Sequence, residues 1–294
     1  MASELTGTLR SLIEAPPILV APGAYDAIGA MIIERAGFPA VYMTGAGTVN
    51  AHLGVPDIAL GTLSEMVENA GRIAEAVSVP VFCDADTGYG TALNVIRTIR
   101  LYERAGVAGV HLEDQVAPKR CGHLTGKQVV SVQEMSGKVA AAADARRDDD
   151  FVIIARTDAR AVEGLDAAID RAHAYVEAGA DVIFPEALRT REELEAFAGA
   201  GLGAPLLANM TEFGQTPFLS TAEFESLGYA AVIYPMLAFR VMLKAIDEAM
   251  IELARTGTQA HLLDRMRSRE ELYELLRYPE YDLASDRYAE GDSS

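Results

Sequence analysis

Short apolar runs alternate with longer amphipathic stretches along most of the chain. Strands of a parallel sheet are buried on both faces and therefore read as continuous apolar runs. Such runs predict strands at 18–21, 40–44, 79–84, 109–113, 151–157, 181–185, 205–209 and 230–234. Apolar residues at helical spacing predict helices at 24–36, 63–76, 92–105, 132–145, 165–178, 191–198, 222–227 and 237–255.

Eight strand–helix units within about 250 residues are typical of a (β/α)₈ TIM-type barrel. A doubly wound open sheet is the alternative, but no Gly-x-Gly-x-x-Gly turn follows the first strand. We therefore expect an α/β barrel as the catalytic domain over 1–255. Residues 256–294 lie outside the eightfold pattern and contain a charged helix near 262–276 and a polar, acidic tail. We expect them to form a helical extension that belongs to the same domain or to a subunit interface.

The chain is strongly acidic, with 43 acidic against 25 basic residues and a net charge of −18. This charge argues against nucleic acid and anionic membranes as partners, because both require a basic surface. No run approaches the roughly 18 apolar residues of a membrane-spanning helix, and the N-terminus lacks a signal-peptide pattern. The two cysteines, Cys83 and Cys121, do not make a disulfide framework. Together these features predict a cytoplasmic protein.

Polar residues follow the predicted strands at their carboxyl ends, where a barrel builds its active site. Asp84 and Asp86 are two residues apart, so in an extended chain they point the same way. With Glu113 and Asp57 they make an all-oxygen cluster that suits Mg²⁺, with Mn²⁺ as the alternative metal. A turn at Asp86 would also explain that residue. The histidines and cysteines show no zinc-ligand spacing.

A second group of polar residues is Lys119-Arg120-Cys121-Gly122-His123, in the predicted loop after the fourth strand. Cationic neighbours lower the pKa of a thiol, which makes Cys121 a candidate acid or nucleophile. A small apolar filler is the alternative interpretation. Cys83, by contrast, lies in a predicted strand and is expected in the core, and His111 and His173 are expected to be structural.

Three arginines, Arg156, Arg240 and Arg269, are candidates for carboxylate recognition, because a guanidinium binds a carboxylate through two hydrogen bonds. Each of them alone is equally explained by a surface ion pair.

The segment 113–123, with Glu113-Asp114-Gln115 and the Lys-Arg-Cys-Gly-His motif, resembles the signature of the isocitrate lyase / phosphoenolpyruvate mutase superfamily. The closest likeness is to the 2-methylisocitrate lyase branch. The motif is characteristic of the carbon–carbon lyases, whereas the mutases lack its Cys. The likeness covers nearly the whole chain, with further matching stretches at 22–27, 155–159, 184–187, 209–214 and 269–274.

The resemblance implies a (β/α)₈ barrel whose last helix is swapped between subunits of a homodimer or homotetramer. It implies Mg²⁺ bound by Asp84 and Asp86, with Asp57 and Glu113 contributing through water. The implied catalytic residues are Cys121, His123, Glu113 and Arg156. The implied contacts to a small anionic carboxylate substrate are Thr44, Gly45, Ala46, Cys121, Gly122, Arg156, Glu186, Asn209, Met210, Thr211, Arg240 and Arg269.

The implied activity is that of an oxo-acid-lyase, which cleaves a 2-methylisocitrate-like acid to pyruvate and succinate with Cys121 as the general acid. At two places the sequence departs from the methylisocitrate lyase pattern, and both bear on the identity of the substrate. Thr44-Gly45-Ala46 stands where methylisocitrate lyases typically read Ser-Gly-Gly, and Leu124 stands where an Arg is expected. The alternatives are a dimethylmalate lyase, an oxaloacetate hydrolase or a carboxyphosphonoenolpyruvate phosphonomutase activity on the same site. An inactive scaffold barrel is disfavoured, because the candidate catalytic set is intact.

The acidic net charge does not exclude such a substrate. Basic side chains and a bound Mg²⁺ can make a local positive site within an acidic protein. The side chains expected to do so are Lys119, Arg120, His123, Arg156, Arg240 and Arg269.

Overall fold

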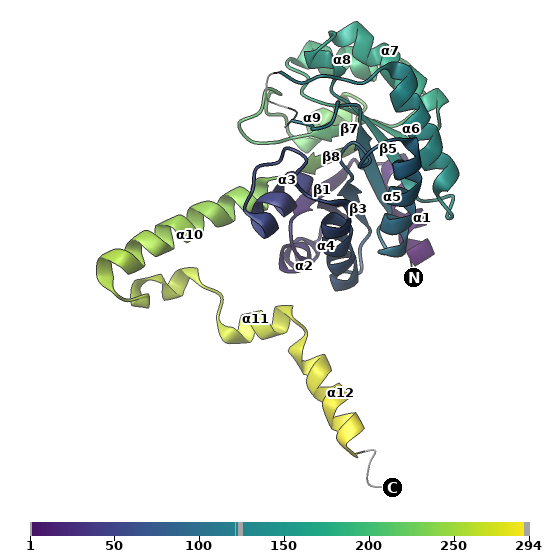
Figure 1. Cartoon of the computed structure of the whole chain (residues 1–294). Helices are drawn as coiled ribbons and strands as arrows, with labels where there is room; N and C mark the ends of the chain where they lie inside the picture. The colour runs from purple at the N-terminus through teal and green to yellow at the C-terminus, as the bar shows by residue number, and fades with distance from the viewer. Residues whose placement is uncertain (1, 121, 123–125, 291–294) are drawn as a thin grey trace. The chain divides into compact units, whose positions relative to one another are not determined.

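Eight parallel strands form the centre of the chain (Figure 1). The computed structural model describes residues 2–120, 122 and 126–290, which fall into two compact units, Met1–Phe239 and Arg240–Ser294. The strands all lie in the first unit: β1 Leu19–Ala24, β2 Val41–Met43, β3 Val81–Asp84, β4 Gly109–Glu113, β5 Val152–Thr157, β6 Val182–Pro185, β7 Leu207–Asn209 and β8 Ala231–Tyr234.

The strands pair in the order β6-β5-β4-β3-β2-β1-β8-β7, and every paired neighbour is parallel. Between β6 and β7 the sheet is joined by one parallel bridge, Ile183 to Leu206, with the Ile183 N–H donating to the Pro205 carbonyl over 3.0 Å. The sheet is therefore a nearly closed barrel, and the predicted (β/α)₈ fold is confirmed.

Helices surround the strands (Figure 1). The helices that follow strands β1 to β8 are α2 Ala27–Arg35, α4 Leu63–Ala76, α5 Ala92–Arg104, α6 Val132–Ala145, α7 Leu165–Glu177, α8 Arg191–Ala198, α9 Thr221–Ser226 and α10 Leu237–Thr256. All eight were predicted. Local capping fixes several of their starts: the Thr62 side chain accepts the Glu65 N–H, and Glu65 accepts the Thr62 N–H over 2.8 Å, at the beginning of α4.

The structure adds elements that the apolar pattern did not predict. α1 Ala2–Glu14 precedes the barrel, α3 Gly45–Thr48 and a π-helical turn Val49–Leu53 follow β2, and a 3₁₀ turn Ala159–Ala161 follows β5. The α3 helix is capped by Thr44, whose side chain accepts the Gly47 N–H over 3.2 Å. A four-residue helix is too short to show a 3.6-residue period, so the hydrophobic pattern gave no sign of it.

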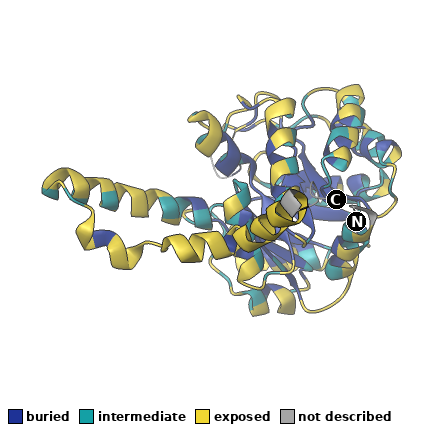
Figure 2. Ribbon diagram, turned by 90° about the horizontal axis from the view of Figure 1, so that it is seen from below, coloured by how far each residue is buried: buried dark blue, intermediate teal, exposed yellow. Residues whose placement is uncertain are grey.

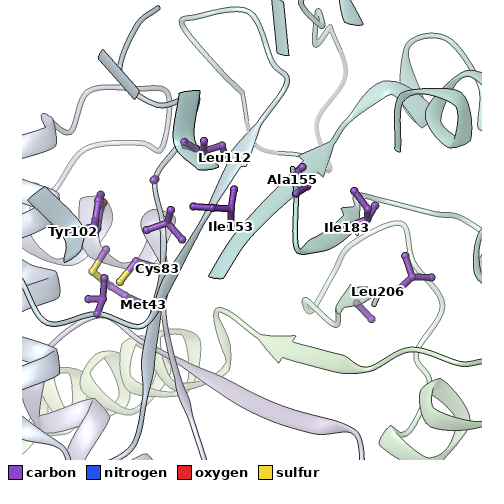
Figure 3. Close-up of a cluster of buried hydrophobic side chains, with 14 of the residues drawn as sticks. Met43, Cys83, Tyr102, Leu112, Ile153, Ala155, Ile183 and Leu206 are labelled. Atoms are coloured by element: carbon purple, nitrogen blue, oxygen red, sulfur yellow. The ribbon is translucent and has the colours of Figure 1, made fainter. Parts of the chain in front are cut away.

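Successive strand residues face opposite sides of the sheet and form two buried layers. Between the strands and the helices, Met43, Cys83, Leu112, Ile153 and Ile183 pack in one hydrophobic cluster (Figure 3). Cys83 is fully buried, as predicted. The barrel interior is filled by the residues of the other parity, Tyr42, Phe82, Ile154 and Phe184. Figure 2 shows the strands buried and the outer helix faces exposed.

Helix α1 packs against the amino-terminal ends of the strands. Leu9 is fully buried and Ile13 nearly so, in one cluster with Leu19, Val152 and Val182, which begin or nearly begin their strands. The amino-terminal end of the barrel is thereby covered, which leaves the carboxyl end for chemistry.

The second unit contains the rest of α10, a 3₁₀ turn Ala260–Arg265, α11 Arg269–Leu275 and α12 Tyr278–Glu290. The charged helix predicted near 262–276 is present as α11 but begins later than predicted, because the Ser268 side chain accepts the Glu271 N–H and starts the helix there. The tail predicted as merely polar is also helical as far as Glu290. Within the described residues no helix has the length and apolar content needed to cross a bilayer.

Candidate active site

A pocket opens at the carboxyl ends of the strands, where the sequence placed the polar residues. Of the predicted site residues, those that line it are Thr44, Ala46, Asp57, Asp84, Gly122, Arg156, Glu186, Asn209 and Thr211. The remaining lining residues are Tyr42, Lys119, Arg120, Phe184, Ile233, Pro235 and Met236.

The acidic cluster surrounds the ammonium group of Lys119. Its Nζ lies 2.7 Å from Asp57 Oδ1 and 2.6 Å from Asp86 Oδ1, and the Lys119 side chain is only 4% exposed. Burial by itself disfavours the charge, but Asp86 and the other nearby carboxylates raise the pKa of Lys119 well above its usual value. The charged Lys119 side chain therefore compensates the negative charge of this cluster. Its place in the Lys-Arg-Cys-Gly-His motif did not reveal this role.

Asp84 and Asp86 lie together, but not in the extended geometry that the spacing predicted. β3 ends at Asp84, and the next turn gives Asp86 a left-handed φ of 49°. Asp84 Oδ1 accepts the Asp86 N–H over 2.8 Å, which closes an Asx turn. Burial raises the pKa of Asp86 to about 6. The turn and the acidic cluster, taken as alternatives from the sequence, are thus both present.

Glu113 at the end of β4 is almost completely buried, with 1% of the residue exposed. Its Oε1 accepts no hydrogen bond from the described residues, and burial raises the pKa of the Glu113 carboxyl well above its usual value. A buried carboxyl of this kind carries a charge only where a cation stabilises it, and Arg156 Nε lies 3.4 Å from Glu113 Oε2.

The donor set fits a hard divalent cation, because carboxylate oxygens are the ligands that Mg²⁺ prefers. Asp84, Asp86 and Glu113 supply buried oxygens, and the cluster already accepts one positive charge from Lys119. Across residues 2–120, 122 and 126–290, no three His, Cys, Asp or Glu side chains are already arranged as metal ligands. Binding would therefore require Lys119 and the carboxylates to adjust.

Arg156 connects the acidic cluster to the opposite side of the pocket. It extends from β5, with its Nε 3.0 Å from Asp158 Oδ2 and 3.4 Å from Glu113 Oε2. Its Nη1 lies 3.7 Å from Glu186 Oε2, and its Cζ lies 5.2 Å from the centre of the Phe184 ring. The guanidinium is thus held by three carboxylates and one aromatic face, and its charge points into the pocket.

Glu186 and Asn209 form a polar wall beside Arg156. Asn209 Nδ2 donates to Glu186 Oε2 over 3.2 Å, and Asn209 Oδ1 is buried with no hydrogen-bond partner in the described part of the chain. Gly122 lies directly against this wall, because a Cβ there would be 2.4 Å from Arg156 Nη2 and 2.6 Å from Glu186 Oε1. Gly45 is similarly close to the acidic cluster, where a Cβ would lie 2.2 Å from Asp84 Oδ2. Both positions require glycine because no side chain fits.

A buried pair of aromatic side chains beneath the pocket was not identified as part of the site from the sequence. The Tyr42 hydroxyl lies 2.8 Å from His111 Nε2, and the same nitrogen lies 3.6 Å from Asp84 Oδ1. Burial lowers the pKa of His111 to about 4, so its ring is neutral at pH 7. His111 is a barrel-interior residue, as expected, and it supports Asp84. The two-residue alternation along β2 and β4 could have indicated that both side chains face inward.

Some predicted residues lie elsewhere or outside the described part of the chain. The Met210 side chain packs in the hydrophobic cluster behind the sheet, and its sulfur accepts the Leu219 N–H over 3.4 Å. Cys121 and His123 lie outside the described residues. Arg240 and Arg269 belong to the second unit, so their predicted substrate contacts stay predictions.

The chain resembles known proteins over almost its entire length. The phosphoenolpyruvate phosphomutase family matches residues 9–254. A 2-methylisocitrate lyase of Aeropyrum pernix is 50% identical over 274 residues, which cover 93% of this chain and 88% of that protein. A 2,3-dimethylmalate lyase of Eubacterium barkeri is 47% identical over 283 residues, 96% of this chain and 98% of that protein.

Among solved structures, a phosphonopyruvate hydrolase in complex with oxalate and Mg²⁺ superposes with a TM-score of 0.88 at 32% identity. The match covers 97% of this chain and 99% of that one. The barrel fold and the polar residues at the strand ends agree with these similarities. The sequence identity to the two lyases, 50% and 47%, is higher than the 32% to the phosphonopyruvate hydrolase. The chain therefore belongs to the phosphoenolpyruvate phosphomutase family, within the isocitrate lyase / phosphoenolpyruvate mutase superfamily, and is a carbon–carbon lyase.

Proposed function

We propose that this lyase cleaves 2-methylisocitrate to pyruvate and succinate in a Mg²⁺-dependent reaction. The observation that carries the proposal is that one pocket contains both a site suited to a cation and a site suited to an anion. A buried acidic cluster suited to a divalent cation lies beside Arg156, Asn209 and Gly122, which are suited to a carboxylate. The relative from Aeropyrum pernix, at 50% identity, supports this choice of substrate.

The chain's own residues supply most of the steps. Arg156 binds a substrate carboxylate and stabilises the negative charge that develops on the departing acid when the C–C bond breaks. The Asn209 side chain, whose Oδ1 accepts no hydrogen bond from residues 2–120, 122 and 126–290, orients polar groups of the same acid. As the C–C bond breaks, the substrate hydroxyl gives its proton to a base and becomes the pyruvate carbonyl, and the Cys121 thiol then donates its proton to the resulting carbanion as general acid. His123, which follows in the motif, is proposed to stabilise the same charge.

Asp84 and Asp86 are proposed to hold Mg²⁺, with Asp57 and Glu113 contributing through water. When bound, the metal supplies a Lewis acid that lowers the pKa of the substrate hydroxyl and polarises the nascent carbonyl. The structure of the phosphonopyruvate hydrolase with oxalate and Mg²⁺ supports this choice of metal.

A second candidate substrate is 2,3-dimethylmalate. The Eubacterium barkeri enzyme matches 98% of its length to this chain, and Thr44-Gly45-Ala46 and Leu124 depart from the methylisocitrate lyase pattern. Both acids yield pyruvate, but the second product is succinate from one and propionate from the other.

A comparison of kcat/KM for the two acids tests the assignment, with pyruvate release coupled to NADH oxidation by lactate dehydrogenase. We expect 2-methylisocitrate to be the better substrate, with activity lost in EDTA and restored by Mg²⁺. A higher kcat/KM for 2,3-dimethylmalate would transfer the assignment to that acid.

We also propose that the enzyme is a homo-oligomer joined through its second unit. Within residues 240–288, large apolar side chains such as Val241, Ile251 and Leu283 are more than 60% exposed, and of the large apolar residues only Leu262 and Leu275 are buried. Helices with such apolar surfaces require a partner, and the superfamily resemblance favours a second copy of this chain. Light scattering during size exclusion would show a dimer or tetramer, whereas a monomer would contradict the proposal.

A further inference from the structure

The loop that carries the Lys-Arg-Cys-Gly-His motif begins and ends on two paired segments. Gln115 forms an antiparallel bridge with Val129. The Val116 N–H donates to the Gln128 carbonyl over 2.9 Å, and the Val130 N–H donates to the Asp114 carbonyl over 2.8 Å. Both ends of the loop are thereby fixed to the end of β4.

Gln115 also binds the backbone of the residue before Cys121. Its Nε2 donates to the Arg120 carbonyl over 2.9 Å, and its Oε1 accepts the Arg120 N–H over 2.9 Å. The Gln115 residue is 1% exposed, so its amide reaches Arg120 from the buried side of the loop and would lose its partners if the loop moved away. A single amide side chain thus satisfies both backbone groups of Arg120.

Lys127 binds the backbone of the residue after Cys121. Its ammonium group donates to the Gly122 carbonyl and, over 2.6 Å, to Asp158 Oδ1. The Lys127 side chain is 1% exposed and that of Asp158 is fully buried. The same Asp158 carboxylate accepts from Arg156 Nε over 3.0 Å. Lys127 therefore connects the loop backbone to the arginine of the pocket.

Gly122 packs tightly against the pocket wall on the side where a side chain would lie. Its α-carbon lies so close to Arg156 and Glu186 that an added methyl group would overlap both side chains. A displacement of the Gly122 backbone would consequently alter the wall of the pocket, and displacements of about 1 Å can cost 10²-fold in rate.

We propose that Gln115 and Lys127 are positioning residues, which hold the backbone on the two sides of Cys121 and, through Asp158, the guanidinium of Arg156. This inference rests on the proposed function, in which Cys121 supplies the proton. Neither side chain touches the reacting atoms. Their effect is to fix the position of the proton donor, Cys121, relative to Arg156, which binds the carboxylate.

The test compares Gln115→Met and Lys127→Met with a matched control, Arg146→Met. Arg146 is also a cation bonded to one carboxylate and one backbone carbonyl, Asp181 Oδ2 at 2.6 Å and the Phe151 oxygen at 2.9 Å, but at the amino-terminal end of the strands. Gln115→Met leaves no buried charge unpaired, so it remains informative if Lys127→Met does not fold. The readouts are kcat, KM, melting temperature and the rate of Cys121 alkylation by N-ethylmaleimide, assigned by mass spectrometry.

We expect kcat to fall about tenfold or more in both variants while KM changes by less than about threefold. The alkylation rate of Cys121 should rise about threefold, since the flanking backbone is released. Lys127→Arg should recover part of kcat, because it retains a buried donor. In the Arg146→Met variant the melting temperature should fall, while kcat, KM and the alkylation rate of Cys121 stay unchanged.

Alkylation rates and kcat within about twofold of the wild type in both variants would overturn the proposal, as would equal changes in Arg146→Met. The alkylation readout needs no substrate. It therefore separates failure of this proposal from failure of the proposed function, which full activity in Cys121→Ser would show.

Discussion

The ammonium nitrogen of Lys119 lies 2.6 Å from Asp86 Oδ1, inside the cluster proposed to bind Mg²⁺. Lys119 also contacts Asp57, at 2.7 Å. The proposed metal and the lysine therefore compensate the same negative charge, and binding of one must weaken the hold of the other.

Lys119→Met should make the metal-free enzyme less stable and increase its response to Mg²⁺. Removing one partner of a buried ion pair costs about 3–5 kcal/mol, and a ligand that binds only the folded state restores stability in proportion to its occupancy. Thermal unfolding with and without Mg²⁺ measures both effects. An Mg²⁺-induced rise in melting temperature equal to that of the wild type would contradict competition between lysine and metal.

Cys121→Ser should reduce kcat by about 10²–10⁴-fold, because a serine hydroxyl is a much weaker acid than a thiol at neutral pH. Substrate affinity should change little, since the carboxylate contacts come from other residues. Stopped-flow turnover and calorimetric substrate binding separate the two quantities. Turnover near that of the wild type would exclude the thiol as the proton donor.

Arg156→Met should lower the free energy of unfolding by about 3–5 kcal/mol, because the guanidinium would be lost from a buried network in which Asp158 would keep only Lys127 of its described cations and Glu113 would lose the cation at 3.4 Å. Arg160→Met is the matched control, since Arg160 pairs with Glu193 nearer the surface, where both side chains are 17% exposed. That pair should be worth about 1 kcal/mol or less. Urea unfolding that gives equal losses for the two variants would contradict this distinction.

The contribution of Glu193 to stability should depend on pH. A hydrogen bond from Arg160 lowers the pKa of Glu193 below its usual value. Its contribution to stability is therefore complete above the unfolded-state pKa, about 4.3, and is lost as the pH falls through the lower folded-state value. The stability difference between wild type and Glu193→Gln should accordingly be present at pH 7 and shrink in acid. Urea unfolding at several pH values checks this, and a difference independent of pH would contradict it.

The sequence predicted the barrel because its strands are continuous apolar runs, and the polar residues directly after them, such as Asp84, Glu113 and Arg156, then meet at one end. Strand order needed no further information, because parallel strands with helical connections follow one another around a barrel.

The partners of these residues could not be predicted in the same way. Lys119 is 33 residues from Asp86 in the chain and 62 from Asp57, and Lys127 is 31 from Asp158. Such pairs depend on the path of a loop, which has no periodic pattern to reveal it. The turn at Asp86 is a different case, because a hydrogen bond between residues two apart is local and the sequence already offered a turn there.

NMR of the products formed from 2-methylisocitrate, with phosphonopyruvate as the competing substrate, distinguishes a carbon–carbon lyase from a phosphonopyruvate-converting enzyme. We predict equimolar pyruvate and succinate, formed only when Mg²⁺ is present, and no turnover of phosphonopyruvate. Conversion of phosphonopyruvate without cleavage of 2-methylisocitrate would contradict the assignment.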